Sequence, residues 1–336
     1  MIPVPDAHPH SGMLTLREAG LERHVTEPTS IIALDWGTTS LRAYRVGSSG
    51  EVLQKRIVTA GILKLPEGGF LQALATVASD WATAHPGATL IASGMVGSRQ
   101  GLQEVPYARA PATLASLAAG CAAVPVSPEH TLHLIPGVSL DDERGRADVM
   151  RGEETQVLGA VPEQGRHLVV LPGTHCKWVT VADAAITGFS THLTGELFEL
   201  LATHSILATT MDATADDEPA FVAGVERGLA EPAALLRELF TARASTLLGR
   251  MESGAMRAHV SGLLLGSELA DACRLHADAL SAAGGVLLLG DAALVQTYAR
   301  AMAVAGISAV PGDPDAAPRG ALRVASAADL VPQPDI

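Results

Sequence analysis

The chain has 336 residues, of which 48% are hydrophobic and only 3% aromatic, and its formal net charge is −13. Two domains with aliphatic cores are the expectation for this length and composition. The negative charge argues against nucleic acid and anionic membrane surfaces as partners. The three cysteines lie far apart and form no C-x-x-C pair, which argues against a disulfide framework or a structural zinc site and favours a reducing cytoplasm.

The first thirty residues mix prolines, histidines and charges, and they lack the apolar run of a signal peptide. We interpret residues 1–30 as a flexible extension with one short helix over Leu14–Arg23. No stretch of the chain approaches the ~18–20 apolar residues that a membrane span requires. The sequence therefore predicts a protein that does not cross a membrane.

A β-hairpin is expected at the start of the first domain, where Ile31–Leu34 and Ser40–Val46 flank a turn of small residues. Glycine lets the backbone of such a turn approach a ligand closely, and hydroxyl and N–H groups can bond phosphate oxygens. Asp35, beside the turn, is out of place in a buried strand unless it has a function.

The second half of the chain repeats this hairpin. Without gaps, Leu34–Val46 aligns with Val170–Ala182, so that Gly37 and Thr38 fall on Gly173 and Thr174. Two such hairpins, one in each half, indicate two lobes that hold a polyphosphate between them. A repeated hairpin that binds no ligand is the alternative.

The remaining segments alternate between strand and helix patterns, which predicts an α/β fold. Further strands are expected at Val52–Thr59, Thr89–Ala92, Leu132–Ile135, Val260–Leu265 and Gly285–Leu289, with the second hairpin beginning at His167. Helices are expected at Phe70–Ala84, Val149–Val161 and Pro232–Glu252, and a surface loop at Pro311–Gly320. The two lobes are expected to span residues 31–150 and 151–336.

Familiar motifs of other nucleotide-binding folds are missing, since there is no G-x-x-x-x-G-K-[ST] and no G-x-G-x-x-G after a strand. Instead, D-W-G-T-T-S resembles the first phosphate hairpin of the acetate kinase, sugar kinase and actin superfamily. More narrowly, the chain resembles 2-dehydro-3-deoxygalactonokinases in A-S-G-M-V-G-S-R-Q-G, D-V-M-R-G-E-E-T-Q, L-P-G-T-H-C-K-W-V and T-H-L-T-G-E-L-F-E-L-L. One departure is Cys176, where the family pattern has Ser, and a thiol is the weaker hydrogen-bond partner.

The resemblance implies two RNase H-like lobes of the actin-like ATPase type, with the active site in the cleft between them. It also implies an ATP-dependent kinase that phosphorylates 2-dehydro-3-deoxy-D-galactonate at its 6-hydroxyl, in galactonate degradation. Phosphoryl transfer needs neutralised phosphate charge, an in-line hydroxyl and a group that takes its proton. Asp35 suits Mg²⁺ that is bound through its coordinated waters, because Mg²⁺ dehydrates reluctantly.

The proton acceptor has three candidates. Glu153 and Glu154 open the helix that follows the first lobe, and Asp148 precedes it. A carboxylate at a helix N-terminus is also a good partner of the helix dipole, worth ~0.3–1 kcal/mol. We expect one of the two glutamates to be the base and favour Glu153 slightly, with Asp148 as the alternative.

Ligand contacts are expected from three parts of the chain. For ATP, the resemblance and the turns indicate Gly37, Thr38, Thr39, Ser40, Gly173, Thr174, His175, Lys177, Gly290 and Asp291, with Gly266 and Ser267 as a similar turn. For the sugar acid, they indicate Ser93, Gly94, Ser98, Arg99, Gln100, Glu104, Thr194 and Glu196. The loop that begins at Ser93 follows a buried strand, at the sheet end where ligands collect in α/β folds. Arg99 is expected to clamp the carboxylate through its bidentate geometry.

Two other functions stay open. An exopolyphosphatase or phosphatase-like hydrolase would use the same hairpins and attack with water, but it has no need of the S-G-M-V-G-S-R-Q-G loop. A non-catalytic sugar-binding regulator would normally carry a DNA-binding extension, and the first thirty residues show no basic helix pair. The sugar epimer and the oligomeric state, a homodimer included, are not decided by the residues.

Overall fold

The computed structural model describes residues 17–19, 28–141, 145–211 and 217–331 of a mixed α/β protein. The chain divides into two compact units, each discontinuous in sequence. Unit 1 comprises Met1–Ser139, Met150–Gly159 and Asp315–Ile336, and unit 2 comprises Leu140–Val149 and Ala160–Pro314. The sequence predicts one boundary at residue 150, whereas the chain passes four times from one unit to the other.

Unit 1 contains a seven-stranded sheet with the order β1-β4-β3-β2-β5-β8-β7. Its strands are β1 (Arg17–Ala19), β2 (Ile31–Trp36), β3 (Leu41–Val46), β4 (Val52–Val58), β5 (Thr89–Gly94), β7 (Ala122–Pro125) and β8 (Thr131–Leu134). Strand β2 pairs antiparallel with β3 and parallel with β5. The predicted phosphate hairpin and the strand before the predicted sugar loop are therefore neighbours.

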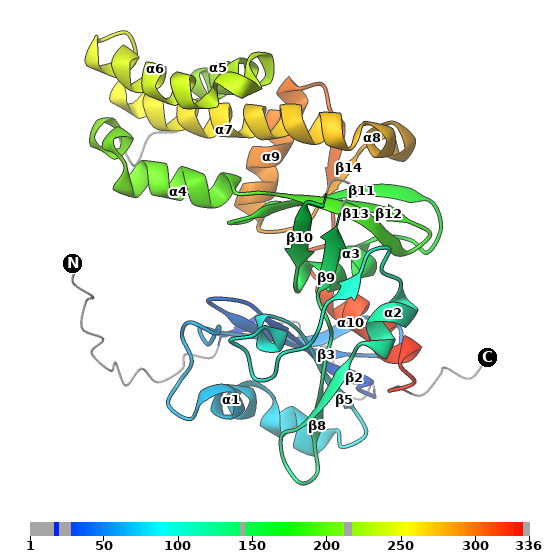
Figure 1. The fold of residues 1–336 in the computed structure, drawn as a ribbon. Helices are drawn as coiled ribbons and strands as arrows, with labels where there is room; N and C mark the ends of the chain where they lie inside the picture. The colour runs from blue at the N-terminus through cyan, green and yellow to red at the C-terminus, as the bar shows by residue number, and fades with distance from the viewer. Residues whose placement is uncertain (1–16, 20–27, 142–144, 212–216, 332–336) are drawn as a thin grey trace. The chain divides into compact units, whose positions relative to one another are not determined.

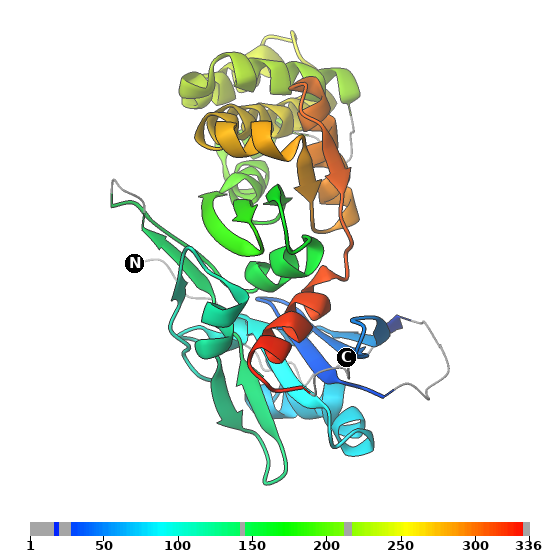
Figure 2. The same ribbon diagram turned by 90° about the vertical axis from the view of Figure 1, so that its right-hand side faces the viewer.

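Two helices cover the two faces of this sheet (Figure 2). Successive side chains of a strand point to opposite faces, and Ile32, Leu34 and Trp36 pack with the apolar face of α1 (Gly69–Ala84) in one buried cluster. Helix α10 (Ala316–Ala327) contacts β2 and β5. The unit also contains α2 (Leu114–Ala119), α3 (Glu153–Ala160) and a 3-10 turn at Met95–Gly97.

Unit 2 contains a five-stranded sheet with the order β13-β12-β11-β14-β15. Its strands are β11 (Arg166–Leu171), β12 (Cys176–Ala182), β13 (Ala185–His192), β14 (Val286–Leu288) and β15 (Ala309–Pro311). Three antiparallel strands are followed by two parallel ones, and this repeats the arrangement of β4-β3-β2-β5-β8 in unit 1. A separate small sheet, in the order β10-β9-β6, consists of β6 (Ala108–Arg109), β9 (Val138–Asp141) and β10 (Ala147–Met150).

Most of the helical residues of unit 2 lie in long helices, of which α5, α6 and α7 lie side by side (Figure 1). The helices are α4 (Thr194–His204), α5 (Glu218–Ala230), α6 (Leu235–Leu247), α7 (Ser253–Leu275), α8 (Ala277–Ala283) and α9 (Ala292–Val304). Helices α5 and α7 approach each other through glycines. A Cβ on Gly262 would lie 2.1 Å from the carbonyl oxygen of Phe221, and one on Gly266 would lie 2.2 Å from that of Val225.

The structure confirms both hairpins, the strand after the first one and the helix at Phe70–Ala84. The predicted strand at Val260–Leu265 is wrong, because these residues lie inside α7. The predicted turn at Gly266 and Ser267 is wrong for the same reason. Apolar residues on several sides of a buried helix hide its period, and its glycines serve close packing rather than a turn.

Four other boundaries differ from the prediction. In place of a helix over Leu14–Arg23, the described residues Arg17–Ala19 form strand β1, which pairs with β4. The helix predicted at Val149–Val161 begins only at Glu153, after β10. The helix predicted at Pro232–Glu252 ends at Leu247, and α10 occupies the second half of the predicted loop Pro311–Gly320.

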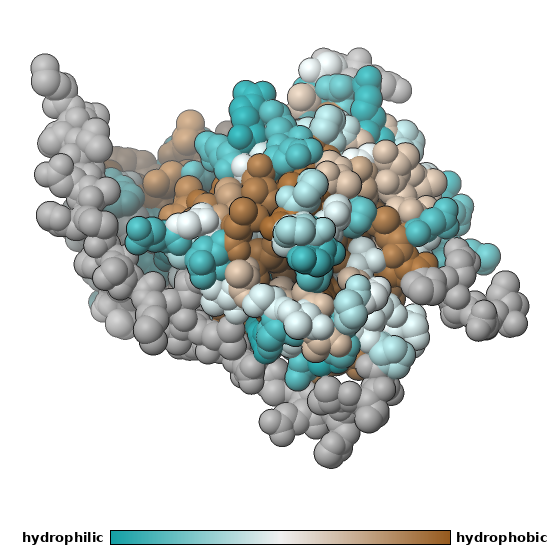
Figure 3. Space-filling model, turned by 90° about the horizontal axis from the view of Figure 1, so that it is seen from below, coloured by the Kyte–Doolittle hydropathy of each residue, from teal (hydrophilic) through white to brown (hydrophobic). Residues whose placement is uncertain are grey.

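Within the ranges that the structure describes, no helix is long and apolar enough to cross a membrane. The face seen in Figure 3 mixes hydrophilic and apolar residues.

Candidate active site

The β2–β3 hairpin presents two threonines to solvent. The Gly37 N–H donates to the Ser40 carbonyl at 2.9 Å and closes the turn, and Thr38 and Thr39 are exposed. The turn is packed from behind by Gly61, where a Cβ would lie 2.3 Å from the Thr39 nitrogen. The backbone of the turn is thus fixed, while its hydroxyl groups stay available to a ligand.

Asp35 lies at the end of β2, directly across from Arg42 of β3. The two side chains form an ion pair at 2.9 Å, with 13% of the Asp35 side chain and 44% of the Arg42 side chain exposed. Such partly exposed pairs contribute only ~0–1 kcal/mol, so a stronger cation can compete for the carboxylate. Across the other edge of β2, Asp35 is in register with Ser93 of β5.

The end of β5 requires glycine and buries its serine. Gly94 has φ +92°, and a Cβ there would lie 2.6 Å from the Trp36 carbonyl oxygen. Ser93 is only 3% exposed, and its Oγ lies 3.2 Å from Oγ1 of Thr155 in α3. Ser93 therefore joins β5 to α3, and the substrate contact of its hydroxyl stays a prediction.

Helix α3 begins against this glycine. Gly152 has φ +109°, and a Cβ on it would lie 3.2 Å from the Gly94 Cα. Glu153 Oε2 accepts the Arg151 N–H at 2.9 Å, and Glu154 Oε2 accepts the Gly152 N–H at 2.7 Å. Both carboxylates thus satisfy backbone donors ahead of the helix.

The two glutamates differ in their surroundings. Glu154 is 0% exposed, and its Oε1 has no hydrogen-bond partner among the described residues. Burial, followed by the neighbouring charge of Glu153, raises the pKa of Glu154 to about 8. A buried carboxylate with a free oxygen and a pKa in this range is typical of functional positions.

The loop after β5 carries the remaining predicted substrate residues of unit 1. Arg99 is 87% exposed at its side chain, and its Nε lies 3.6 Å from Oε1 of Glu104. Gln100 is also exposed, whereas Ser98 Oγ is buried without a partner in the described part of the chain. The exposed side chains are accessible but are not held in one geometry.

In unit 2, the start of α4 packs directly against the β11–β12 hairpin. His175 Nε2 lies 2.7 Å from Glu196 Oε2, and the Glu196 N–H donates to the Thr174 carbonyl at 2.9 Å. A Cβ on Gly195 would lie 2.2 Å from the Gly173 carbonyl oxygen. Residues predicted for ATP and for the sugar acid, Thr194 among the latter, therefore lie together here.

The turn after β14 adjoins the same hairpin. Gly290 has φ +153°, and a Cβ on it would lie 3.2 Å from the Pro172 carbonyl oxygen. Asp291 Oδ1 accepts the Ala293 N–H at 2.9 Å and caps α9. The absence of a Cβ at Gly290 thus lets this turn lie close to Pro172, while Asp291 has a structural role at the helix terminus.

Lys177, which the sequence predicts as a nucleotide contact, is held by hydrogen bonds inside unit 2. Lys177 is 6% exposed, and its Nζ donates to the Val149 carbonyl at 2.6 Å and to Thr191 Oγ1 at 2.8 Å. Thr191 in turn donates to Asp148 Oδ1 at 2.6 Å. The ammonium therefore fastens β10 to the sheet of unit 2, and Cys176 is fully buried in the core.

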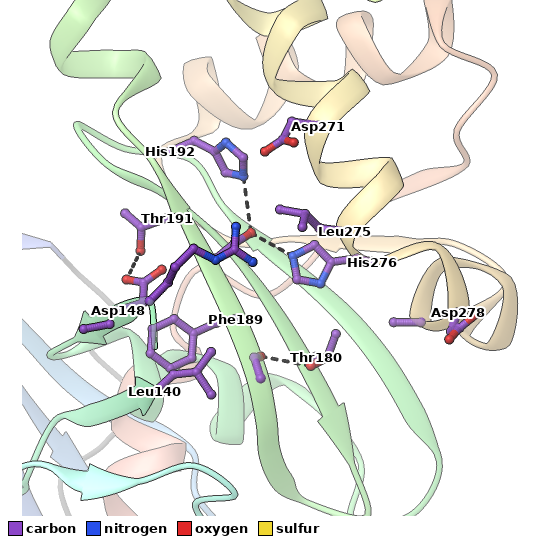
Figure 4. Close-up of a pocket in the computed structure, with 15 residues that line it drawn as sticks. Leu140, Asp148, Thr180, Phe189, Thr191, His192, Asp271, Leu275, His276 and Asp278 are labelled. Atoms are coloured by element: carbon purple, nitrogen blue, oxygen red, sulfur yellow. Dashed lines mark hydrogen bonds between the residues drawn. The ribbon is translucent and has the colours of Figure 1, made fainter. Parts of the chain in front are cut away.

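A cavity of about 560 Å³ lies elsewhere in unit 2, between β13, the end of α7 and α8 (Figure 4). Ser190 Oγ lies 2.7 Å from His276 Nε2 and 3.3 Å from His192 Nε2. Burial, followed by His192, lowers the pKa of His276 to about 4, so this imidazole is neutral at pH 7. Of the predicted candidates only Asp148 lines the cavity, and no residue spacing in the sequence pointed to it.

Comparison with known proteins gives one consistent result. A family model described as 2-keto-3-deoxy-galactonokinase matches residues 35–325. A probable 2-dehydro-3-deoxygalactonokinase of Rhizobium meliloti is 39% identical over 305 residues, which are 88% of this chain and 96% of that protein. The 2-dehydro-3-deoxygalactonokinase of Escherichia coli K12 is 36% identical over 286 residues, which are 84% of this chain and 93% of that protein.

A crystal structure agrees with the sequence matches. This structure, described as a 2-dehydro-3-deoxygalactonokinase from Sinorhizobium meliloti, matches with a TM-score of 0.78 and 37% identity, and the match covers 89% of this chain and 98% of that chain. These matches define the class of protein as an α/β kinase. More narrowly, the chain belongs to the 2-keto-3-deoxy-galactonokinase family.

Proposed function

We propose that the protein transfers the γ-phosphoryl group of ATP to the 6-hydroxyl of 2-dehydro-3-deoxy-D-galactonate, with Mg²⁺, in galactonate degradation. The observation that carries the proposal is the group of residues at the ends of β2 and β5. There, an exposed Gly-Thr-Thr turn, the carboxylate of Asp35 and the N-terminus of α3 with Glu154 come together in unit 1. The names of the relatives support the substrate.

In this proposal the hydroxyl groups of the exposed Thr38 and Thr39 bind phosphate oxygens. Asp35 would hold Mg²⁺ through the waters of the ion, and the ion would supply charge neutralisation on the phosphates. The described residues contain no group of three His, Cys, Asp or Glu that could hold a metal alone. Mg²⁺ suits this arrangement because it usually binds one or two carboxylates together with substrate phosphates.

Glu154 is the proton acceptor in this proposal. Its Oε2 is held by the Gly152 N–H, which fixes the carboxylate, while Oε1 is left for the acceptor hydroxyl. A pKa near the working pH suits a general base, because such a group is both ionised in part and basic. Glu153 then serves mainly to satisfy the backbone ahead of α3.

Unit 2 supplies the nucleotide contacts in this proposal, through Gly173, Thr174 and His175 and through the backbone at Gly290. The repeated strand order supports two RNase H-like lobes of the actin-like ATPase type. We further propose that the reacting groups meet in the cleft between the lobes. The three free cysteines, Cys121, Cys176 and Cys273, support a reducing cytoplasm.

The direct test is an ADP-release assay with the keto acid, with glucose or galactose, and with buffer alone. We expect rapid ADP release only with the keto acid. Equal release without an acceptor would indicate a hydrolase instead. Binding of the acid without any release would indicate a regulator.

A further inference from the structure

Arg151 forms no ion pair with a carboxylate among the described residues, although its charge acts on the nearby carboxyl of Glu154. Its Nη2 donates to the Val105 carbonyl at 2.8 Å, and its guanidinium carbon lies 4.2 Å from the centre of the Tyr107 ring. Its Nε and Nη1 atoms are buried and have no hydrogen-bond partner among the described residues. Two of its three nitrogens are thus left without an acceptor.

Such an arrangement is unfavourable for folding alone. Nearly all buried polar groups in proteins have a partner, and a buried charge without one is strongly destabilising. The natural complement of a guanidinium edge is a carboxylate, which can accept two parallel hydrogen bonds. Nε and Nη1 lie on different edges of the guanidinium, so a carboxylate would pair with Nη1 together with the second N–H of Nη2. The unused donors of Arg151 therefore point to an anionic ligand.

The position of Arg151 joins the sugar loop to the proton acceptor. A Cβ on Gly97 would lie 3.0 Å from Nη1 of Arg151, so this part of the loop after β5 is in contact with the guanidinium. Along the chain, Arg151 is followed by Gly152, which contacts Gly94 and binds the carboxylate of Glu154. A carboxylate on Arg151 would thus be held within the same group of residues as the proposed base.

Arg99, the clamp expected from the sequence, offers a weaker site. Its side chain is 87% exposed and is loosely paired with Glu104. A charge in water gains little from a new partner, and ordering a long exposed side chain opposes binding. The partly enclosed guanidinium of Arg151 is already fixed by Val105 and Tyr107.

We propose that Arg151, rather than Arg99, binds the carboxylate of the sugar acid and sets the preference for acids over neutral sugars. This inference rests on the proposed function and names the residue that selects the substrate class. Because Nε and Nη1 are covered, the loop that contains Gly97 has to shift when the carboxylate binds. Substrate binding and rearrangement of this loop are therefore coupled.

The test compares the keto acid with its neutral carboxamide as acceptors in the ADP-release assay. Arg151→Gln removes the charge and should raise KM for the acid by ~10–150-fold, since a hydrogen bond to a charged group is worth ~1.5–3 kcal/mol. The same change should raise KM for the carboxamide much less. Arg151→Lys keeps the charge but loses the planar pair of N–H donors. Its KM for the acid should lie between those of the wild type and Arg151→Gln.

Two further variants make the comparison decisive. Arg109→Gln removes an exposed charge from β6 and should behave like the wild type on both acceptors. Arg99→Gln should lose clearly less acid preference than Arg151→Gln. The proposal is overturned if Arg99→Gln shows the larger loss, or if Arg151→Gln loses equally on acid and carboxamide while its unfolding midpoint is unchanged.

Calorimetric binding of the keto acid in the absence of ATP separates this proposal from the proposed function. A wild type that binds the acid but transfers no phosphate would refute the kinase reaction, and Arg151→Gln would still be tested by its loss of binding. If the wild type phosphorylates the acid and Arg151→Gln binds it as tightly as the wild type, Arg151 is not the clamp.

Discussion

The two hairpins share one strand order but stand in different chemical surroundings. The hairpin of unit 1 lies beside the carboxylate of Asp35 and the start of α3, where Glu154 is buried with a free oxygen. At the hairpin of unit 2, His175 contacts Glu196, and the ammonium of Lys177 donates hydrogen bonds within the unit. The topology thus repeats the Gly-Thr turn, but the acidic neighbours differ, since Glu196 beside the second turn is paired with His175 whereas Glu154 near the first keeps a free oxygen.

The largest effect that sharpens this contrast is expected at Glu154. Glu154→Gln keeps the shape and removes the proton acceptor, so kcat should fall by ~10²–10⁴-fold. Glu153→Gln is the matched control and should show only the loss of a helix-terminal charge, worth ~0.3–1 kcal/mol. Single-turnover rates of both variants decide the assignment. A large loss in Glu153→Gln with a normal Glu154→Gln would reverse the two roles, and full activity in both would leave Asp148 as the candidate.

The next largest effect is expected at Asp35, whose replacement should lower kcat by ~10²-fold or more. Asp35→Asn removes the negative charge that attracts Mg²⁺, so kcat should fall while KM for the sugar acid changes modestly. Steady-state kinetics over a Mg²⁺ series would show whether added metal rescues part of the rate. An Asn variant with near-normal kcat would remove the metal role from unit 1.

Stability should depend on pH through Glu154. Its pKa in the fold is about 8, above the ordinary value of a glutamate, so the folded protein binds more protons than the unfolded chain between these values. The free energy of unfolding should therefore fall as the pH rises from about 4.5 to about 8, by on the order of a few kcal/mol. Urea unfolding at several pH values measures this slope. If Glu154→Gln has the same slope as the wild type, the carboxyl is not the cause.

The smallest effect should come from the hairpin of unit 2. Gly195→Ala places a Cβ 2.2 Å from the Gly173 carbonyl oxygen, so the turn has to shift. We expect a loss of ~1–3 kcal/mol in stability and a higher KM for ATP, with a smaller effect on KM for the sugar acid. Gly87→Ala, which meets nothing within 4 Å, is the control. A rise in KM for the acid alone would place the acid, not ATP, at this turn.

The sequence was most informative where local patterns determine the structure. Strand alternation and a Gly-Thr turn were enough to predict both hairpins, and a regular apolar period predicted α1. It failed at Val260–Leu265, because the glycines of α7 allow close contact with α5 and look like strand boundaries in the sequence.

For the candidate site, residue type predicted position only in part. Exposed Thr38 and Thr39 agree with a ligand-binding turn, and Glu154 has the surroundings of a functional carboxylate. Lys177 and Arg151 show where residue type fails to predict a role. Burial and hydrogen bonds to backbone that is distant in sequence decide whether a cation has N–H donors available for a ligand. Those contacts come from tertiary packing and leave no mark in local spacing.

The central claim is that the protein moves a phosphoryl group from ATP to the keto acid rather than to water. The phosphorus NMR spectrum of a reaction with ATP, Mg²⁺ and 2-dehydro-3-deoxy-D-galactonate tests it directly. We predict a phosphomonoester signal that grows in step with ADP and is split by the two protons on carbon 6. Inorganic phosphate as the one new signal besides those of ADP, or an ester signal without that splitting, would contradict the account.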